Sequence, residues 1–161
     1  MMETYRKYCY SPVGRLLLEA DDLALTSIIF DEGSLAGETA TASSVLIDTL
    51  KQLNEYFDGK RKQFDLPLAP EGTDFQQQVW RLVSGVAFGE TKSYGELAHQ
   101  LGSPDYSRAV GLANGRNPIP IIIPCHRIIG ANGQLTGYAG GLERKKWLLL
   151  HEQRLSGLSL F

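Results

Sequence analysis

The 161-residue chain has only two cysteines, Cys9 and Cys125, which lie 116 positions apart. Two distant cysteines do not make the disulfide framework of a small secreted domain, and they suit a reducing compartment in which Cys125 stays a free thiol. No apolar run approaches the roughly 20 residues that cross a bilayer, and the N-terminus lacks an apolar signal core. These absences predict a cytoplasmic protein with no membrane partner.

The chain also lacks a strong charge of either sign, with 16 Lys or Arg against 18 Asp or Glu. A net charge of −2 argues against indiscriminate binding to nucleic acid. The charge is unevenly distributed: residues 1–70 carry 7 basic and 11 acidic side chains, whereas residues 71–161 carry 9 and 7. A polyanion, if one binds, is therefore expected on the second part of the chain.

Signals for metal ions and cofactors are missing as well. Cys9 has no histidine or second cysteine nearby at the spacing of zinc ligands, so we expect no zinc site. Residues 130–141 contain five glycines, but no Gly-Lys-Ser or Gly-Lys-Thr follows them, so they are not a phosphate-binding loop. The sequence therefore predicts chemistry carried out without a metal ion or a cofactor.

An apolar stretch from Ile119 to Ile123 leads into Pro124-Cys125-His126-Arg127. The stretch predicts a short buried strand that stops at Pro124, because proline cannot continue a ladder of hydrogen bonds. A thiolate is a nucleophile, and an imidazole can remove or hold its proton. We interpret the tetrapeptide as a nucleophile on a rigid support. The alternative is an inert packing cysteine, since adjacent side chains of an extended segment point to opposite faces.

The first part of the chain predicts a small antiparallel sheet with one helix and contains no cluster of reactive side chains. Alternating apolar residues, bounded by turn residues, favour three strands, and apolar residues at helical spacing follow them. The expected strands are residues 5–10, 15–20 and 23–30, the expected helix is residues 45–57, and residues 64–68 would add a further strand. We expect this domain to span residues 1–70.

The second part, residues 73–161, predicts a mainly helical domain. A capping box at Thr73 and Gln76 begins an amphipathic helix, and Ser93 and Glu96 begin a second, shorter one. Ser103-Pro104 then begins a third helix after Gly102, which gives a helix-turn-helix pattern. A last helix is expected from about Leu142 through Glu152.

The third of these helices has two contrasting faces. Tyr106, Ala109, Val110 and Ala113 are expected on its buried face. The opposite face presents Arg108, Gly111 and Gly115, a long cation beside almost no side-chain bulk. Because each helical glycine costs about 1 kcal/mol, its presence suggests close approach of another backbone, either protein or nucleic acid. Ordinary helix packing with a solvated Arg108 is the alternative.

Two features after the tetrapeptide suit a reactive site. The glycine-rich loop 130–141, in which Tyr138 is the only large polar side chain, would let a flat ligand approach the backbone. Glu152 in the last helix supplies a carboxylate that could orient His126, as a nucleophile, a base and a third group do in catalytic triads.

These motifs, taken together and in this order, resemble the O6-alkylguanine-DNA alkyltransferases. The resemblance rests on Pro124-Cys125-His126-Arg127 preceded by Asn117-Pro118, and on three further blocks that span residues 93–98, 108–111 and 138–149. It is close over about residues 73–153 and is strongest to the bacterial Ogt-type enzymes. It implies an α+β fold, with a ribonuclease H-like N-terminal sheet and helix followed by a helical domain with a helix-turn-helix.

The resemblance implies a suicide reaction of direct DNA repair. An O6-alkylguanine, or an O4-alkylthymine, would be flipped out of duplex DNA, and its alkyl group would move irreversibly to Cys125. Glu152 would orient His126, which would activate the thiol through a bridging water. Tyr94 would hydrogen-bond the base and help to neutralise the leaving guanine, and Asn117 would brace the active-site loop.

The same resemblance assigns residues to the DNA and to the base. Arg108 would fill the gap in the base stack while the small face of its helix enters the minor groove. The expected DNA-binding residues are Ser93, Tyr94, Arg108, Ala109, Gly111, Gly115 and Arg116. The expected pocket for the alkylated base is lined by Tyr94, Ile128, Tyr138 and Ala139. The protein would act as a monomer, with cooperative binding along DNA as a further possibility.

Two departures from the family pattern bear on DNA binding and metal content. Asp105-Tyr106-Ser107 stands where many relatives have small residues, so a carboxylate and a bulky ring come near the phosphates. The zinc ligands that animal members carry in their first domain are not evident.

Three other readings remain: a sensor that binds alkylated DNA without transfer, a helix-turn-helix regulator without chemistry, and a cysteine hydrolase, for which no oxyanion hole is identified.

Overall fold

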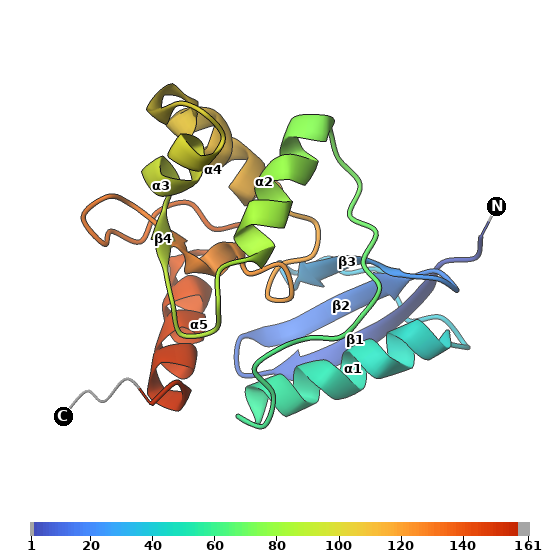
Figure 1. Cartoon of the computed structure of the whole chain (residues 1–161). Coiled ribbons are helices and arrows are strands. Elements are labelled where there is room, and N and C mark those ends of the chain that lie inside the picture. The colour runs from blue at the N-terminus through green and yellow to red at the C-terminus, as the bar shows by residue number, and fades with distance from the viewer. Residues whose placement is uncertain (1, 158–161) are drawn as a thin grey trace. The chain divides into compact units, whose positions relative to one another are not determined.

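The computed structural model describes residues 2–157, which form two compact units that divide between Glu71 and Gly72. The first unit contains a sheet and one helix, and the second is mostly helical (Figure 1). The α+β fold predicted from the sequence is confirmed.

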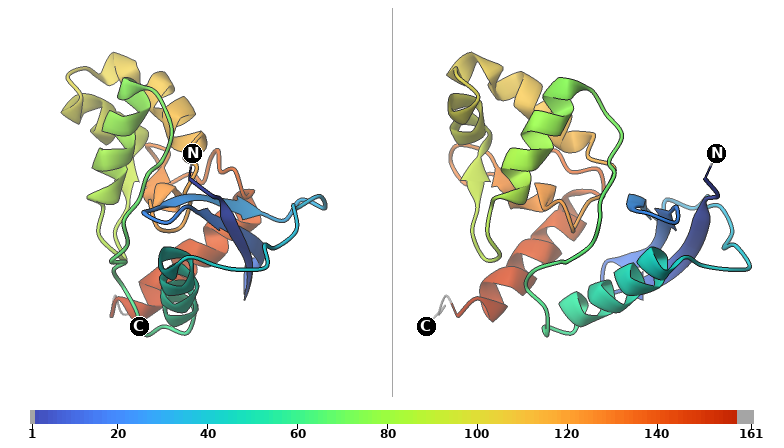
Figure 2. Two further views of the ribbon diagram at one scale, coloured as in Figure 1. Left: turned by 90° about the vertical axis from the view of Figure 1, so that its right-hand side faces the viewer. Right: turned by 45° about the vertical axis from the view of Figure 1, so that its right-hand side comes forward.

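The N-terminal unit is an antiparallel meander of β1 (Tyr5–Ser11), β2 (Gly14–Ala20) and β3 (Leu25–Phe30). Side chains alternate across the strands, so that Cys9, Leu16 and Phe30 lie in register and are buried. Helix α1 (Ser44–Phe57) lies along one face of this sheet (Figure 2). Its apolar residues at helical spacing provide the second layer of the core.

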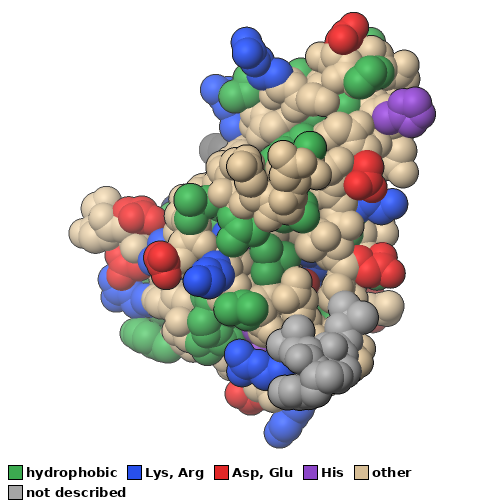
Figure 3. Space-filling model, turned by 90° about the vertical axis from the view of Figure 1, so that its left-hand side faces the viewer, with side chains coloured by type: hydrophobic (Ala, Val, Ile, Leu, Met, Phe, Trp, Pro, Cys, Tyr) green, Lys and Arg blue, Asp and Glu red, His purple; other side chains and the backbone are tan. Residues whose placement is uncertain are grey.

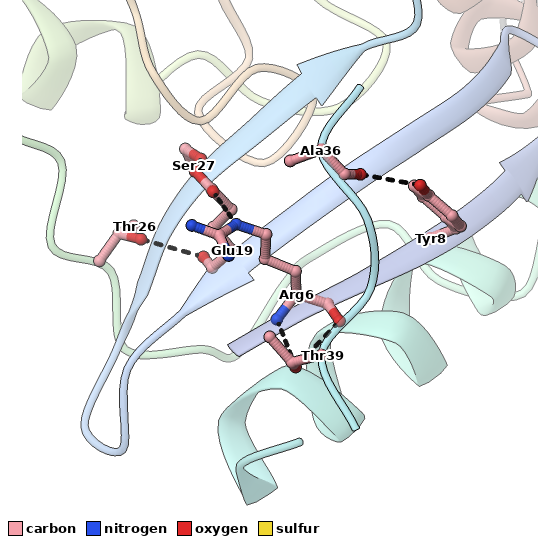
Figure 4. Close-up of polar contacts among 7 residues, drawn as sticks. All are labelled: Arg6, Tyr8, Glu19, Thr26, Ser27, Ala36 and Thr39. Atoms are coloured by element: carbon pink, nitrogen blue, oxygen red, sulfur yellow. Dashed lines mark hydrogen bonds and ion pairs between the residues drawn. The ribbon is translucent and has the colours of Figure 1, made fainter. Parts of the chain in front are cut away.

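The outer edge of β1 is covered by the segment that precedes α1. Thr39 donates its N–H to the carbonyl of Arg6 at 3.0 Å, and the N–H of Arg6 donates to Oγ1 of Thr39 at 3.0 Å. Two residues along, the Tyr8 hydroxyl donates to the carbonyl of Ala36 (Figure 4). The segment thus satisfies backbone groups that an open edge would offer to another strand.

Residues 64–68 do not form the strand expected of them. Leu68 makes a single parallel bridge with Leu25, supported by Leu25 N–H to Pro67 O and Ala69 N–H to Leu25 O, both 2.9 Å. Pro67 and Pro70 flank this bridge, and a proline has no N–H with which to extend a ladder.

The C-terminal unit groups three helices at one end, and places the last helix at the other (Figures 1 and 2). The helices are α2 (Asp74–Ser84), α3 (Tyr94–Gln100), α4 (Ser107–Gly115) and α5 (Leu142–Leu155). The predicted capping box of Thr73 and Gln76 begins α2, and Ser93 caps α3 by accepting from Glu96 N–H at 3.0 Å. Two short strands, β4 (Lys92–Ser93) and β5 (Ile128–Ile129), pair in parallel.

The second helix of the helix-turn-helix begins later than its sequence pattern suggests. Residues Pro104–Tyr106 form a 3-10 turn capped by Ser103, and α4 begins at Ser107. A 3-10 turn has three residues per turn, which shifts the phase of the side chains. The prediction that Tyr106 and Ala109 share the buried face is therefore wrong, because both are exposed. The buried residues of α4 are Val110, Ala113 and Asn114.

Residues 119–123 are buried apart from the half-buried Ile122, but they do not form the predicted strand. Three prolines between residues 118 and 124 remove the N–H donors that a strand needs, and the chain turns on itself instead. The Asn117 side chain organises this turn, accepting from Ile119 N–H at 3.0 Å and donating to Ile123 O at 2.8 Å. Ile121 takes a φ of 75°, a strained value for a β-branched residue.

We predict that Asn117→Ala destabilises the C-terminal unit by about 2–4 kcal/mol, because it leaves one buried donor and one buried acceptor without a partner. Urea unfolding followed by far-UV circular dichroism measures the change. Asn132→Ala, at an exposed loop position, is the matched control and should cost less than about 0.5 kcal/mol. Equal stabilities for the two variants would contradict the role of Asn117.

Candidate active site

Cys125 lies at the end of the buried turn, at the first position of a 3-10 turn (Cys125–Arg127). Its side chain is 3% exposed, and its N–H donates to Ile123 O at 2.7 Å. Burial raises the pKa of the Cys125 thiol to about 11, although the Asn117 side chain and the charge of Lys145 act in the opposite direction. The thiol is therefore protonated at neutral pH and needs a group that accepts its proton.

His126 is fully buried beside the carboxylate of Glu152. Its Nε2 lies 2.7 Å from Oε2 of Glu152. Because a carboxylate only accepts, Nε2 carries the hydrogen, and Nδ1 presents a lone pair. Nδ1 is buried and has no hydrogen-bond partner among residues 2–157. Burial lowers the pKa of His126, more than the neighbouring carboxylate raises it, so the ring is a neutral base at pH 7.

Arg127 holds the same carboxylate from a second direction. Its Nε donates to Oε1 of Glu152 at 2.7 Å, and its Nη2 donates to Oε2 at 3.0 Å. The third nitrogen, Nη1, donates to the carbonyl of Val86 at 2.7 Å. Burial alone would raise the pKa of Glu152, but His126 and Arg127 outweigh it and hold that pKa far below its ordinary range. Glu152 is therefore an anion at every physiological pH.

A second polar group connects the walls around Cys125. The ammonium of Lys145, which is fully buried, donates to Ile128 O at 2.6 Å and to Thr136 O at 2.8 Å. The Tyr94 hydroxyl donates to the same Thr136 carbonyl at 3.0 Å. The lysine nitrogen also lies 5.8 Å from the centre of the Tyr94 ring. Elements α3 and α5 thus meet at one carbonyl of the glycine-rich loop, and Lys145 also connects α5 to β5.

The loop residues expected in the base pocket differ in exposure. Tyr138 is part-exposed as a whole, but its hydroxyl oxygen is buried. Burial, followed by the negative charges of Cys125 and Glu152, raises the pKa of Tyr138 well above its ordinary value. Ala139 is exposed. Tyr138 therefore belongs electrostatically to the same cluster as Cys125, whereas Ala139 lies at its open edge.

Helix α4 presents its small residues outward, as its pattern indicates. Arg108, Gly115 and Arg116 are exposed, and a Cβ placed on Gly115 would meet no atom within 4 Å. A Cβ on Gly111 would lie 3.8 Å from the ring of Tyr94, an ordinary van der Waals distance, so Tyr94 lies against the helix at this glycine. On its inner side, Asn114 donates to the carbonyl of Cys125 at 3.2 Å. Helix α4 is thus connected to the backbone of the candidate nucleophile through the single side chain of Asn114.

The structure brings most of the expected site residues together. Cys125, His126, Glu152 and Asn117 form one buried cluster, and Tyr94, Ile128 and Tyr138 adjoin it. Of the residues expected to bind DNA, Arg108, Ala109, Gly111 and Gly115 lie on α4, Arg116 follows it, and Ser93 and Tyr94 lie at the start of α3. Sequence reasoning missed Lys145, which looked like part of a solvated basic run. Its position three, four and seven residues before Leu148, Leu149 and Glu152 is the signal that places it on the buried face of α5.

Residues 2–157 hold no cluster of three or more His, Cys, Asp or Glu side chains that would bind a metal ion. Within the same residues, no helix combines the length and the apolar character that crossing a membrane requires.

We predict that the free energy of unfolding falls as the pH drops below about 6.5, the ordinary pKa of histidine. A depressed pKa of His126 in the folded protein means that the unfolded chain binds the extra proton first, so stability is present above that pH and is lost below it. Urea unfolding between pH 5 and 8 measures the slope, at most about 1.4 kcal/mol per pH unit for one proton. His126→Gln should flatten it, and a slope unchanged by that substitution would contradict the assignment.

Two protein-family models match the chain and between them cover nearly all of it. Residues 4–70 match the ribonuclease-like domain of 6-O-methylguanine DNA methyltransferase, and residues 74–154 match the DNA-binding domain of the same enzyme. A methylated-DNA–protein-cysteine methyltransferase of Methanosarcina acetivorans is 49% identical over 143 residues, covering 86% of this chain and 92% of that protein.

Solved structures agree with the family models. The crystal structure of the O6-methylguanine methyltransferase of Mycobacterium tuberculosis superposes with a TM-score of 0.87 at 42% identity, covering 98% of both chains. The structure of the enzyme from the same organism in complex with DNA gives a TM-score of 0.85 at 45% identity, covering 93% of both chains. The chain therefore belongs to the O6-methylguanine DNA methyltransferase family, and its activity is that of a DNA-binding methyltransferase that repairs alkylated DNA.

Proposed function

We propose that Cys125 is the residue that accepts the alkyl group, and that it reacts once and irreversibly. The observation that carries this proposal is a buried thiol whose neighbour in the chain is a neutral imidazole, with Nε2 of that imidazole held by an ionised carboxylate. The second cysteine, Cys9, is also buried, but it lies in the N-terminal sheet with no base beside it, and burial raises its pKa to about 11. Cys125 is the thiol that has a route for its proton.

The reaction is a single displacement at the alkyl carbon. The Cys125 proton passes to Nδ1 of His126 through a water molecule between the two groups. Water suits this position, because Nδ1 is buried and has no hydrogen-bond partner among residues 2–157. The sulfur–carbon bond then forms as the carbon–O6 bond breaks. The guanine leaves with the electron pair and takes up one proton, which balances the proton that His126 accepted from the thiol. The Tyr94 hydroxyl, which donates to the Thr136 carbonyl in the structure, would turn its hydrogen to the base to support that step. Glu152 stabilises the imidazolium that forms.

The base reaches Cys125 by leaving the DNA stack. A carbon on O6 of a stacked guanine cannot be approached in line by a thiol that is itself buried, so flipping is required. Tyr94, Ile128, Tyr138 and Ala139 surround the place where the base would lie. The same pocket would take O4-alkylthymine, whose alkyl oxygen has a similar position on a smaller ring.

The outer face of α4 is the surface that we assign to the minor groove. Gly115 leaves open space there, and Arg108 is exposed on the same helix, so a narrow groove meets little bulk and one long cation. Ala109, Gly111 and Arg116 belong to this surface, and Ser93 and Tyr94 lie where α3 begins. At the top of Figure 3, where α3 and α4 lie, basic side chains gather on one side and acidic ones on the other.

The departure at residues 105–107 has a structural explanation. The Tyr106 ring is 44% exposed and makes an edge contact with Phe75 of α2, with ring centres 6.4 Å apart. Tyr106 therefore packs across the start of α2 instead of lying on the small-residue face of α4. We infer that Tyr106 leaves the groove-binding face of α4 clear.

We also infer that the protein acts as a monomer. A reducing cytoplasm would keep Cys125 a free thiol.

The primary test is intact-protein mass spectrometry after mixing with duplex DNA that contains one O6-methylguanine. We expect a mass increase of one methylene group per protein molecule, mapping to Cys125, with no further turnover. Cys125→Ser should abolish the adduct while DNA binding is retained, and Cys9→Ser is the matched control that should react normally. A methylated Cys125→Ser protein would disprove the assignment of the acceptor.

We further predict that Arg108→Ala slows transfer from duplex DNA by roughly 10- to 1000-fold, because an extruded base is no longer replaced in the stack. Transfer from free O6-benzylguanine, which needs no flipping, should change less than about threefold. Single-turnover rates on both substrates measure the difference. Arg154→Ala, at an exposed position of α5, is the control. Equal losses on both substrates would reject a flipping role for Arg108.

A further inference from the structure

Asn114 is a buried polar side chain that the proposed chemistry does not use. It lies near the C-terminal end of α4 and is 1% exposed, a rare degree of burial for an asparagine. Asparagine is also a weak helix former, because its side chain competes for backbone hydrogen bonds. The other two buried residues of α4, Val110 and Ala113, are apolar. An apolar residue would suit position 114 equally well, so helix packing does not explain the amide.

The contact of Asn114 with the nucleophile uses only half of its amide. Nδ2 donates to the carbonyl of Cys125 at 3.2 Å. That bond braces the backbone of Cys125, and a brace needs the N–H group alone. Oδ1 of the same amide is buried and has no hydrogen-bond partner among residues 2–157. A buried acceptor without a protein partner is destabilising, and such groups commonly bind an ordered water.

A second acceptor of this kind belongs to the next residue of the same turn. The Cys125 carbonyl, which the Asn114 amide contacts, is part of the peptide bond to His126. Nδ1 of His126 is buried and also has no hydrogen-bond partner in the described part of the chain. Both Oδ1 and Nδ1 offer lone pairs and neither can donate, so they cannot bond each other. One water molecule has two hydrogens and can donate one to each.

We propose that Asn114 is a positioning residue for alkyl transfer: its Oδ1 accepts one hydrogen of the water molecule that carries the Cys125 proton to His126. The proposal rests on the relay that the proposed function assigns to these two residues. The water donates its other hydrogen to Nδ1 of His126, and a lone pair of the water oxygen then accepts from the Cys125 thiol. Three partners in three directions fix the orientation of the water.

The proton moves through this water without changing it. As the water gives a hydrogen to Nδ1 of His126, it takes the hydrogen of the Cys125 thiol, and the sulfur keeps the electron pair that attacks the alkyl carbon. The hydrogen bond to Oδ1 makes the water oxygen a better acceptor, because hydrogen bonds in a chain polarise one another. Asn114 itself gains and loses no proton, and it touches neither the alkyl group nor the base.

Other groups around the thiol carry charge or titrate, and their effects must be separated from that of Asn114. Lys145 of α5, whose pKa burial lowers to about 8, and Tyr138 of the glycine-rich loop both interact with the charge of Cys125. Glu152 stays ionised and acts on His126. Asn114 is neutral at every pH, so replacing it leaves these effects in place. The ratio of wild-type and variant rates at each pH removes them.

The test uses Asn114→Leu, which nearly keeps the shape of the side chain and removes both of its hydrogen-bonding groups. Val110→Ala, which removes buried apolar atoms from the same helix, is the matched control for lost packing. Single-turnover transfer from free O6-benzylguanine is measured between pH 7 and 9, so that DNA binding plays no part. Far-UV circular dichroism reports folding at each pH. NMR spectra of protein with ¹⁵N-labelled histidine report the hydrogen bonding of Nδ1 of His126.

We expect Asn114→Leu to transfer roughly tenfold more slowly than wild type at pH 7, because the relay water loses one of the partners that hold it. The deficit should shrink as the pH rises, since a thiolate that forms directly needs no relay. The Nδ1 resonance of His126 should move toward that of an imidazole nitrogen without a hydrogen bond. Val110→Ala should match wild type in both the rate and the resonance.

Two kinds of result would overturn the inference. Either a deficit of the same size at every pH or an unchanged Nδ1 resonance would mean that Asn114 only braces the Cys125 backbone. The other result holds even if Asn114→Leu fails to fold. A crystal structure of the wild-type protein should show one ordered water within about 3.2 Å of both Oδ1 of Asn114 and Nδ1 of His126, and its absence there would reject the role. Wild-type protein that forms no alkyl adduct at all would instead refute the proposed function.

Discussion

The C-terminal unit is built around one buried negative charge, the carboxylate of Glu152. A lone carboxylate in this position would be destabilising, because burial strongly disfavours the charged form. Arg127 compensates for this cost with a bidentate ion pair, and Nε2 of His126 donates to Oε2 of the same carboxylate. The same arginine reaches the carbonyl of Val86, so the loop after α2, the turn that carries Cys125 and the last helix are held by a single charge network. Removing Arg127 or Glu152 would leave the charge of the other buried and without this ion pair.

The prolines around Cys125 make the chain turn, although the apolar run in which they lie predicts a strand. A strand would have placed Cys125 and His126 on opposite faces of an extended segment. The observed 3-10 turn, with Asn117 bonding both ends of the preceding loop, replaces that extended geometry and buries both residues. The absence of proline N–H groups and the strained backbone at Ile121 thereby allow two neighbours in sequence to belong to one site.

Much of the architecture was predictable because local signals agree with the fold. The alternating strands, the cap at Thr73 and the glycine stops of α3 and α4 depend on residues close in sequence. The errors occurred where backbone features override the apolar pattern. The isoleucines at 119–123 match a strand by composition, but a side chain outside the run bends them into a turn. Tyr106 matches a helix face by spacing, yet a 3-10 turn moves it toward Phe75.

The same contrast applies to the candidate site. Cys125, His126 and Glu152 could be nominated from chemistry and motif alone. Arg127 was visible in the tetrapeptide, but its ion pair with a residue 25 positions away was not. Lys145 was hidden by two basic neighbours, because a run of charges usually means a solvated face. Only helical phase relative to Leu148 and Leu149 separates it from Lys146, and the two carbonyls that it binds cannot be located without the loop geometry.

The high pKa of Cys125 has a consequence for the lifetime of the protein in a cell. A molecule that reacts only once is lost whenever its sulfur meets the wrong partner, such as peroxide, glutathione disulfide or a stray electrophile. Those side reactions run through the thiolate and require access to it. A buried, protonated sulfur has neither property, so it stays dormant during storage.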